Sequence, residues 1–364
     1  MSPAPASAIE RLLKKTSPDK GDISVAVVEN KEDKREPMYT KEEAIGKKLG
    51  YDKIVSTGKA TTPSDLRWPT FMMVAPFNHS FNADVPNNVW MKKQNKKIDY
   101  DKAWQQWSEL YQFIAANGLV YLLPNYHGKH QDLIYVANNF LYVEPDDVVI
   151  MSNFTSEPRR GEEIEGREML EALNYKCVDP PSDCHWEGEA DLKFVRDNIY
   201  VGGYGIRSEN KTFDWMEKNF KMKISRIHMT SQKNYHLDCQ FSPISTDTAL
   251  VCTKIMDPPD IKMVEKLVDI VDIPEKEAEA MACNIVRVGS NILVCSSVSE
   301  LKESDDAYLV ESSKIARLSN ACAKLGLGLV VFNLSAFDVS GAALSCNVAH
   351  LNFVDYQSPN GEVF

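Results

Sequence analysis

The feature of this sequence that most limits its fold is a unit of short strands and one amphipathic helix that recurs every ~50 residues along most of the chain. The clearest helical stripe lies in 99–117, where apolar residues include Trp104 and Trp107, and we expect both tryptophans in the core. Gly118 ends this helix, and 119–123 is a predicted strand. The recurrence predicts a repeated α/β architecture rather than a single doubly wound sheet.

The other elements are predicted from the same periodicities. Further predicted strands cover 68–74, 148–151, 199–203, 284–288, 292–296 and 329–334, with two more inside 236–253 on either side of a turn at 245–247. A hairpin is predicted over 133–143, turning near Asn138-Asn139. Predicted helices cover 161–174, 211–220, 261–270, 275–282 and 305–325.

Composition divides the chain near residue 66. Residues 1–66 are rich in Lys, Asp, Glu, Pro, Ser and Thr and predict a partly disordered extension, whereas 67–364 is the predicted catalytic domain. The chain has 364 residues, a hydrophobic content of 43% and a formal net charge of -11. This charge argues against a nucleic-acid or anionic-membrane partner, because either needs clustered Lys and Arg. No apolar run approaches the ~20 residues that a membrane span requires.

The eight cysteines form no CxxC pair, which predicts reduced, mostly buried thiols in a cytoplasmic compartment. A mitochondrial transit peptide is the alternative, but Glu10, Asp19 and Asp22 count against it. The seven histidines and the cysteines have no metal-ligand spacing, so we predict no metal site. No GxGxxG or GxxxxGK run is present, and we predict that the protein uses no cofactor.

Three segments carry chemically reactive side chains. Cys346 follows a turn of small residues, His236 lies in Tyr-His-Leu-Asp, and Glu187 lies in Trp-Glu-Gly-Glu-Ala-Asp. Each residue alone is more often structural than functional. Together, a thiol, an imidazole and carboxylates suit chemistry on a guanidinium, because attack on this resonance-stabilised cation requires a strong, soft nucleophile.

Several motifs occur in the order found in one superfamily. They are Asn88-Val89-Trp90-Met91, Asp132 to Asn138, Arg159-Arg160-Gly161-Glu162, Glu187 to Asp191, Gly203 to Arg207, Tyr235 to Pro243 and Ala282-Cys283-Asn284. Residues 71–353 thereby resemble the pentein, or guanidino-group-modifying, superfamily. This resemblance implies an α/β fold, a five-bladed pseudo-fivefold propeller of ββαβ units. The most similar branch comprises the arginine dihydrolases, which convert arginine to ornithine, ammonia and carbon dioxide.

The sequence departs from this branch at a few positions. Ser340-Gly341-Ala342-Ala343 replaces a run of glycines, Glu189 replaces a small residue and Val89 replaces proline. If the glycines are needed for positive φ, the cysteine turn would have a different shape. The Arg159-Arg160 pair is expected at the surface.

The resemblance implies a catalytic role for four residues. Cys346 would attack the guanidino carbon and form an amidino-thioether, which water then cleaves. His236 would protonate the leaving amine and later deprotonate the water. Glu187 and Asp238 would hold the guanidinium by charge-assisted hydrogen bonds.

The resemblance also implies four substrate-binding residues. Asn88 and Asn138 are polar positions of the branch, and Arg207 would bind the substrate carboxylate. Asp191 is either a substrate ligand or a supporting residue of the turn. The fold and these residues predict arginine or a related guanidine as the small-molecule partner.

The leading prediction is therefore an arginine dihydrolase. An arginine deiminase giving citrulline and an amidinotransferase with an amine acceptor are alternatives within the superfamily. A catalytically inactive protein that senses arginine is an alternative from another class. The sequence is compatible with a homo-oligomer and does not fix the oligomeric state.

Overall fold

The structure is a computed structural model that describes residues 62–66, 68–79, 84, 86–93, 98–125 and 130–356. Apart from 62–66, the predicted N-terminal extension lies outside these residues. Ser64 donates a hydrogen bond to Asp147 (3.1 Å), and the carbonyl of Leu66 accepts one from Asn352 Nδ2 (3.1 Å). These few residues therefore contact the folded part of the chain, and the boundary at residue 66 stays a prediction.

The described strands form five three-stranded sheets. In the order of the strands within each sheet, they are β15 (Ala349–His350), β1 (Thr70–Val74) and β2 (Leu119–Leu123); β3 (Phe140–Val143), β4 (Val148–Met151) and β5 (Lys176–Val178); β6 (Leu192–Arg196), β7 (Ile199–Tyr204) and β8 (Lys223–His228); β9 (Phe241–Pro243), β10 (Thr248–Val251) and β11 (Asp269–Asp272); and β12 (Ile285–Val288), β13 (Asn291–Cys295) and β14 (Gly328–Phe332).

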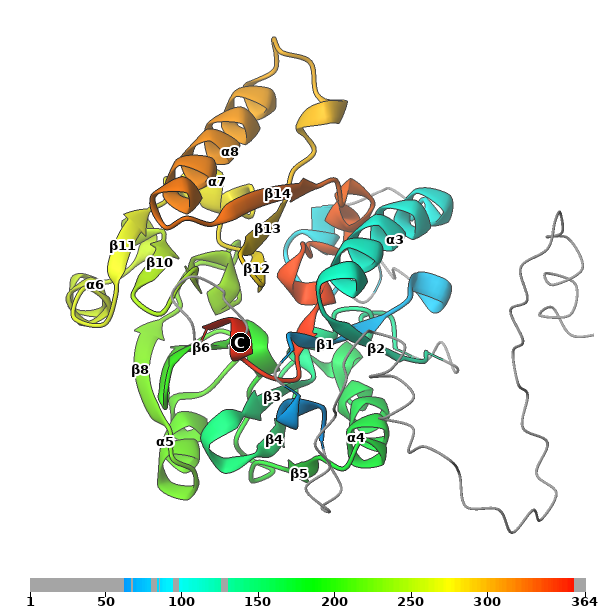
Figure 1. Ribbon diagram of the computed structural model, residues 1–364, viewed down its shortest axis with the longest axis vertical. Coiled ribbons are helices and arrows are strands. Elements are labelled where there is room, and N and C mark those ends of the chain that lie inside the picture. The colour runs from blue at the N-terminus through cyan, green and yellow to red at the C-terminus, as the bar shows by residue number, and fades with distance from the viewer. Residues whose placement is uncertain are drawn as a thin grey trace, which may run out of the picture. The chain divides into compact units, whose positions relative to one another are not determined.

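Each sheet has the same internal plan. The first two strands pair antiparallel, and the second and third pair parallel, which requires a crossover connection. A helix makes each crossover, and Figure 1 shows these helices on the outside of a ring of sheets. The helices are α3 (Tyr100–Asn117), α4 (Glu162–Ala172), α5 (Asn210–Asn219), α6 (Pro258–Val264) and α8 (Asp306–Lys324), while the short α7 (Glu275–Glu279) joins the fourth and fifth sheets. The predicted propeller of ββαβ units is confirmed.

Helix α3 illustrates how the sequence sets the outer layer. The carboxylate of Asp99 caps the first turn by accepting a hydrogen bond from the backbone N–H of Lys102 (3.1 Å). Trp107 is buried, as predicted, whereas Trp104 is 42% exposed, so its predicted core position is wrong. Trp104 lies at the edge of the buried stripe and stacks on Trp107 with ring centroids 5.7 Å apart.

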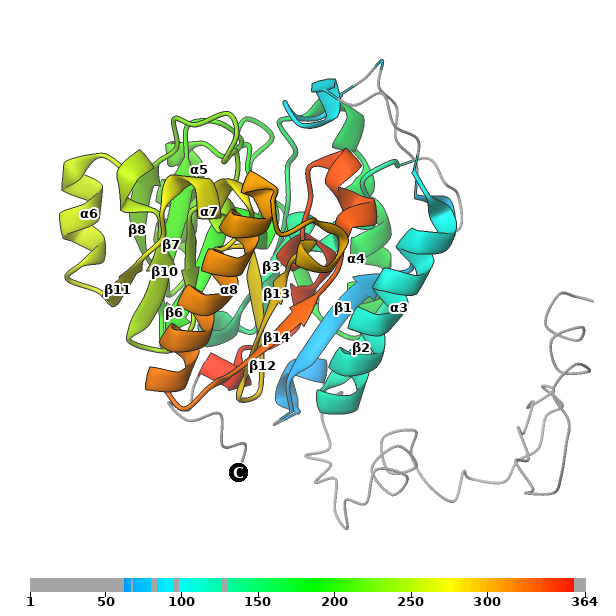
Figure 2. The same ribbon diagram turned by 90° about the horizontal axis from the view of Figure 1, so that it is seen from above.

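The ring is closed by strands from opposite ends of the described chain. In β15, His350 lies opposite Phe71 and Ala349 opposite Met72 of β1. Figure 2 shows the fifth sheet beside this first sheet, with α8 and α3 on the outer surface. Because β15 follows Cys346 directly, ring closure also brings the predicted nucleophile into the interior.

Two predicted elements are wrong in detail. Residues 136–138 form a 3₁₀ turn instead of a strand, and the hairpin joins β3 to β4 through a turn that ends at Asp147 with φ 49°. The predicted helix over 261–270 ends at Val264, and its last part belongs to β11. In both places periodicity alone did not separate a short strand, β3 or β11, from the residues that precede it.

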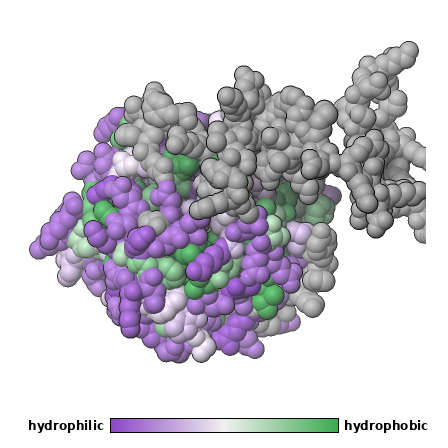
Figure 3. Space-filling model, turned by 60° about the horizontal axis from the view of Figure 1, so that its bottom comes forward, coloured by the Kyte–Doolittle hydropathy of each residue, from purple (hydrophilic) through white to green (hydrophobic). Residues whose placement is uncertain are grey.

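Apolar side chains fill the space between neighbouring sheets in four clusters. The space-filling view in Figure 3 shows one face on which hydrophilic residues predominate and hydrophobic ones are interspersed. Among the described helices, none combines the length and apolar character that crossing a membrane requires.

Candidate active site

Cys346 lies in a 3₁₀ turn, Ser345–Asn347, that follows a tight bend at Gly341. Gly341 has φ 66°, and a Cβ there would come within 2.7 Å of both Asn88 Oδ1 and Trp90 Cβ, so glycine is required. Ala342 and Ala343 are not among the residues with positive φ. The departure from a glycine run is therefore tolerated, because only position 341 needs glycine.

The thiol of Cys346 is buried among polar groups. Asn284 donates a hydrogen bond from Nδ2 to Sγ (3.7 Å) and accepts one from the backbone N–H of Ser345 (2.8 Å). The hydroxyl of Ser345 donates to Asp238 Oδ2 (2.6 Å), which brings this carboxylate beside the cysteine turn. Burial, reinforced by the negative charge of Asp238, raises the pKa of the Cys346 thiol to about 12. Without a bound cation, the thiol is therefore protonated at neutral pH.

Glu187 connects two of the other predicted residues. Its Oε2 accepts hydrogen bonds from Arg207 Nη1 (2.8 Å) and lies 2.8 Å from His236 Nε2. Burial alone would raise the pKa of Glu187, but Arg207 and His236 outweigh it and lower this pKa to about 2. Glu187 is therefore an anion, and its buried Oε1 has no hydrogen-bond partner.

Asn138 approaches the same place from a third turn. Its turn contacts both the turn of Cys346 and the turn that follows Glu187. A Cβ at Gly188 would come within 2.6 Å of the Asn138 carbonyl carbon, so glycine permits this approach. The buried Nδ2 of Asn138 also lacks a partner. A free acceptor on Glu187 and a free donor on Asn138 thus lie on touching turns, and both could bind a planar polar group.

Asp191 is a buried residue that connects two segments of the site. Its Oδ2 accepts a hydrogen bond from Ser208 Oγ (2.6 Å), and its Oδ1 accepts one from the backbone N–H of Leu237 (3.0 Å). Burial raises the pKa of Asp191 to about 6, although His236 opposes the shift. These bonds fix the segment that carries His236, so the geometry favours positioning over direct contact with substrate.

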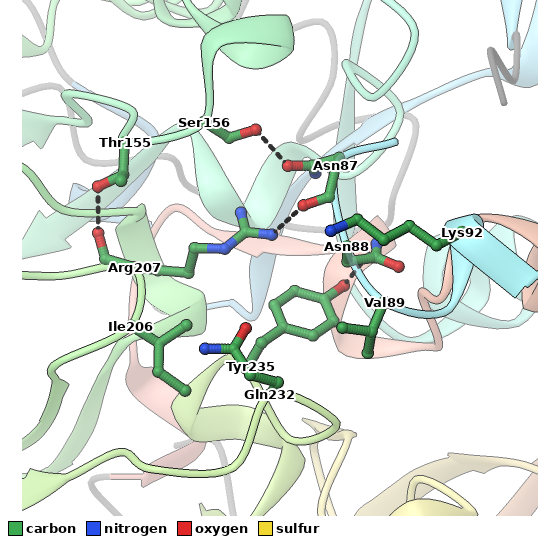
Figure 4. Close-up of a pocket in the computed structure, with 10 residues that line it drawn as sticks. All are labelled: Asn87, Asn88, Val89, Lys92, Thr155, Ser156, Ile206, Arg207, Gln232 and Tyr235. Atoms are coloured by element: carbon green, nitrogen blue, oxygen red, sulfur yellow. Dashed lines mark hydrogen bonds between the residues drawn. The ribbon is translucent and has the colours of Figure 1, made fainter. Parts of the chain in front are cut away.

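A cavity of about 230 Å³ lies next to this cluster (Figure 4). Figure 4 shows the cationic groups of Lys92 and Arg207 extending into it from different elements. Two predicted binding residues line it, while Cys346, His236, Glu187 and Asp238 do not. The lining residues are Asn87, Asn88, Val89, Lys92, Thr155, Ser156, Ile206, Arg207, Gln232 and Tyr235.

Three of the lining side chains separate the cavity from the buried cluster. Asn88 Nδ2 donates to the carbonyl of Ser340 (2.8 Å) and lies 3.4 Å from the hydroxyl of Tyr235. That hydroxyl donates to the carbonyl of Gly341 (2.8 Å), and the guanidinium of Arg207 lies 4.8 Å from the Tyr235 ring centroid. We call Asn88, Arg207 and Tyr235 the wall. Through Arg207, the wall links the cavity to Glu187.

Sequence reasoning missed two charged residues beside the site. Asp132 is fully buried; its Oδ2 accepts a hydrogen bond from Asn87 (3.0 Å), and its Oδ1 has no partner. Arg159 is also buried and forms an ion pair with Glu162 (2.6 Å), so its expected surface position is wrong. Asp132 opens one of the ordered motifs. The three-residue spacing of Arg159 and Glu162 was also a usable signal, although Arg159 ends a 3₁₀ turn and Glu162 begins α4.

The described residues contain no group of three or more His, Cys, Asp or Glu side chains placed to hold a metal ion. All eight cysteines are unpaired, and most of them are buried, as predicted. The absence of a cofactor and of a metal from the reaction stays a prediction.

Five ββαβ blades in one ring, with a cysteine, a histidine and carboxylates buried next to one cavity, define the pentein class of guanidino-group-modifying proteins. The sequence profile of one family matches residues 75–323, more than half of the chain, and its description is N,N dimethylarginine dimethylhydrolase, eukaryotic. The chain belongs to this family.

Curated relatives include two cyanobacterial proteins. The bifunctional arginine dihydrolase/ornithine cyclodeaminase AgrE of Nostoc sp. is 29% identical over 238 residues, which are 64% of this chain and 33% of AgrE. The bifunctional arginine dihydrolase/ornithine cyclodeaminase ArgZ of Synechocystis sp. is 27% identical over 237 residues, again 64% of this chain and 33% of the relative. The chain thus spans about a third of the length of these relatives.

Solved structures agree on the fold. ArgZ without ligand superposes with a TM-score of 0.68 at 23% identity, covering 78% of this chain and 40% of ArgZ. A mutant of DDAH from Pseudomonas aeruginosa complexed with citrulline gives a TM-score of 0.61 at 17% identity and covers 78% of this chain and 99% of DDAH. The resemblance to the pentein superfamily is confirmed, and its arginine dihydrolase branch is among the relatives.

Proposed function

We propose that this protein hydrolyses the guanidino group of arginine to give ornithine, ammonia and carbon dioxide, with Cys346 as nucleophile. The observation that carries this proposal is the pair of unsatisfied atoms, Glu187 Oε1 and Asn138 Nδ2, on turns that meet the turn of Cys346. Buried polar atoms rarely lack partners, so such a pair marks a place for a polar ligand. The arginine dihydrolase relatives support the same substrate.

Arginine matches the charges around the cavity. Its carboxylate would bind Arg207 and Lys92, the two cations that line the cavity. Its α-ammonium would pair with the free Oδ1 of buried Asp132. Its guanidinium would then extend past the wall to Glu187 Oε1. When the substrate carboxylate draws Arg207 toward the cavity, the hydrogen bond from Arg207 to Glu187 Oε2 weakens. This oxygen then also becomes available to the substrate.

The bound guanidinium would also activate the thiol. An opposite charge within a few ångströms lowers a thiol pKa, so the cation offsets the burial that raises the pKa of Cys346. The thiol releases its proton to water, and the thiolate forms a C–S bond to the guanidino carbon while the C–N bond to the departing nitrogen breaks. His236 gives its proton to this nitrogen and then takes one from the water that cleaves the C–S bond. Arginine and water thereby give citrulline and ammonia.

The dihydrolase reaction needs a second round on the same carbon. Citrulline and water give ornithine, ammonia and carbon dioxide, which requires the neutral ureido group to stay bound. Asn138 offers an amide, and its free Nδ2 can donate to the ureido oxygen. An anion at this position would lose its cationic partner after the first round and favour release of citrulline. This is our physical reason for proposing a dihydrolase over a deiminase.

A second candidate substrate follows from the family assignment. The matching profile is described as N,N dimethylarginine dimethylhydrolase, so a methylated arginine would be attacked by the same thiol with a methylated amine as leaving group. The amidinotransferase and the arginine sensor stay as alternatives. We also propose a reducing, cytoplasmic location, which the eight unpaired thiols support.

The test is product analysis with purified protein. Arginine and asymmetric dimethylarginine are supplied separately, each with and without glycine. Ornithine and two equivalents of ammonia from arginine are the expected products. Citrulline as the end product would indicate a deiminase, dimethylamine a dimethylarginine hydrolase, and guanidinoacetate an amidinotransferase. Binding of arginine without any product would identify a sensor and overturn the proposal.

A further inference from the structure

Glu189, the residue that departs from the family's small side chain, forms a fully buried ionic cluster. Its Oε1 lies 2.6 Å from His350 Nδ1, and its Oε2 accepts a hydrogen bond from the backbone N–H of His350 (2.9 Å). Lys193 Nζ lies 3.9 Å from the same carboxylate. We call Glu189, Lys193 and His350 the clamp. All three side chains are less than 10% exposed.

The clamp joins two segments that carry the proposed chemistry. Glu189 lies in the 3₁₀ turn that directly follows Glu187. His350 lies in β15, the strand that directly follows the turn of Cys346. A side chain on the carboxylate segment thus holds the backbone of the nucleophile segment, although the two are far apart in sequence.

β15 depends on this contact more than a longer strand would. It has two residues, and its register with β1 consists of the pairs of His350 with Phe71 and Ala349 with Met72. So short a pairing gives little resistance to sliding. The hydrogen bond from the His350 backbone to Glu189 adds a fixed point outside the sheet.

The clamp is also an electrostatic neighbour of the thiol. Burial acts to raise the pKa of Glu189, but His350 and Lys193 outweigh it and lower this pKa, so Glu189 is an anion that offsets the charge of Lys193. Lys193 lowers the pKa of Cys346, whereas Asp238 raises it.

Other titratable groups also face the clamp and the thiol. Asp355 interacts with His350, Tyr356 interacts with Glu189, and Arg287 lies over the Tyr356 ring. Tyr135, Tyr235 and Cys239 face the thiol, and burial raises the pKa of each of these three.

We propose that the clamp is a positioning device for the proposed reaction, which fixes Cys346 relative to Glu187 and balances the charge beside the thiol. The proposal rests on the proposed function for its catalytic part. Its electrostatic part concerns the thiol alone and can be measured without any substrate.

The test variant is Glu189→Gln, which keeps an oxygen acceptor for His350 but removes the negative charge. The charge of Lys193 is then no longer offset, and the thiolate of Cys346 is favoured. Iodoacetamide labelling of the Cys346 peptide, followed by mass spectrometry as a function of pH, should show a midpoint lowered by roughly half a unit or more. We expect kcat for arginine to fall roughly tenfold with little change in KM, because misplacement affects the transition state and not binding.

A matched control is Glu277→Gln. Glu277 is also a buried glutamate, and its ionic partner Arg317 lies on α8. This variant should lower Tm without moving the labelling midpoint. The double variant Glu189→Gln/Lys193→Met removes both charges, so its midpoint should return toward that of the wild type while the loss in kcat persists.

A folded Glu189→Gln protein with the wild-type labelling midpoint and wild-type kcat would overturn the proposal. A midpoint shift of the same size in Glu277→Gln would also overturn it, because the effect would then not belong to the clamp. If wild-type protein does not convert arginine, the proposed function fails, and the labelling midpoint still tests the clamp.

Discussion

Two glutamates that lie two positions apart have opposite surroundings. Glu187 Oε2 bonds to Arg207 and His236, while its Oε1 is buried without a partner. Glu189 has protein partners for both oxygens in the backbone and ring of His350. The difference indicates that Glu187 keeps one oxygen for a ligand, whereas the fully paired Glu189 supports the fold around it.

The comparison makes Cys346 the residue whose loss should have the largest effect. Cys346→Ala should reduce turnover of arginine by roughly 10⁴-fold or more, because it removes the proposed nucleophile from the turn that contacts the turn of Asn138. Ammonia release measures the rate, and calorimetric titration with arginine should still detect binding. Substantial ammonia release by this variant would exclude the covalent mechanism.

The variants Glu187→Gln and Glu189→Gln each replace a carboxylate with an amide, and together they test the comparison directly. Glu187→Gln should lower kcat/KM by roughly 10²- to 10³-fold, because the substrate guanidinium loses its anionic partner. This is a larger loss than the roughly tenfold expected for Glu189→Gln. A greater loss of activity in Glu189→Gln than in Glu187→Gln would contradict the assignment of Glu187 to substrate binding and of Glu189 to support of the fold.

Glu187 should also contribute to acid stability. Its folded-state pKa of about 2 is below the ordinary value of 4.5, so its contribution is present above pH 4.5 and is lost as the pH falls toward 2. The size is on the order of 3 kcal/mol by linkage. Urea unfolding of wild type and Glu187→Gln at pH 7 and pH 3 should show a smaller stability difference at the lower pH. An equal or larger difference at pH 3 would contradict the assigned charge state.

A charge introduced at the second unsatisfied atom should change the product. Asn138→Asp places an anion beside Glu187, so the neutral ureido intermediate leaves an unpaired charge behind and departs. The citrulline-to-ornithine ratio from labelled arginine should rise severalfold, even if the total rate falls. Asn139→Asp is the matched control, because Asn139 is also buried and adjoins Asn138. An unchanged ratio in an active Asn138→Asp protein would remove our reason for preferring a dihydrolase.

Lys92 tests the outer part of the site, where a single charge is exposed to water and the effect should be small. Lys92→Gln should raise KM for arginine roughly threefold to tenfold and leave kcat unchanged. The turnover of agmatine, which lacks the carboxylate, should not change. Lys233→Gln, at a surface pair with Glu279, is the control. An equal effect on arginine and agmatine would separate Lys92 from carboxylate recognition.

The smallest expected effect is that of a chelator. The alternative ligand for the free oxygens of Glu187 and Asp132 is a metal ion instead of a cationic substrate. We expect dialysis against EDTA to leave the rate with arginine unchanged. A loss of activity that zinc or manganese restores would assign these oxygens to a metal.

Long periodic elements and ordered motifs were predictable from the sequence, whereas several short strands were not. Helix α8 lies within its predicted range because its apolar stripe is long. β5, with three residues, and β15, with two, were missed because so few residues show no period. β8 was also missed, because its buried residues Ile224 and Ile227 are three positions apart and do not show a period of two.

Site residues could be predicted from the sequence where a single motif identifies the residue and its role. The contact of His236 with Glu187 agrees with two such motifs. Arg207 was expected at the substrate carboxylate, but its bond to Glu187 became visible only in three dimensions. The same holds for Glu189, whose departure was evident, whereas its partner His350 is 161 positions away. Pairings between distant segments need the folded ring, because local sequence does not encode them.

Ring closure by β15 has a consequence for the protein during its synthesis. The ribosome makes Cys346 and β15 after all the other described strands. Until then β1, near the start of the described chain, lacks its antiparallel partner. A nascent chain that has reached β14 has neither the thiol nor the closing strand. Such long-range pairing forms late and slowly. The proposed activity can therefore appear only after the whole ring has been completed.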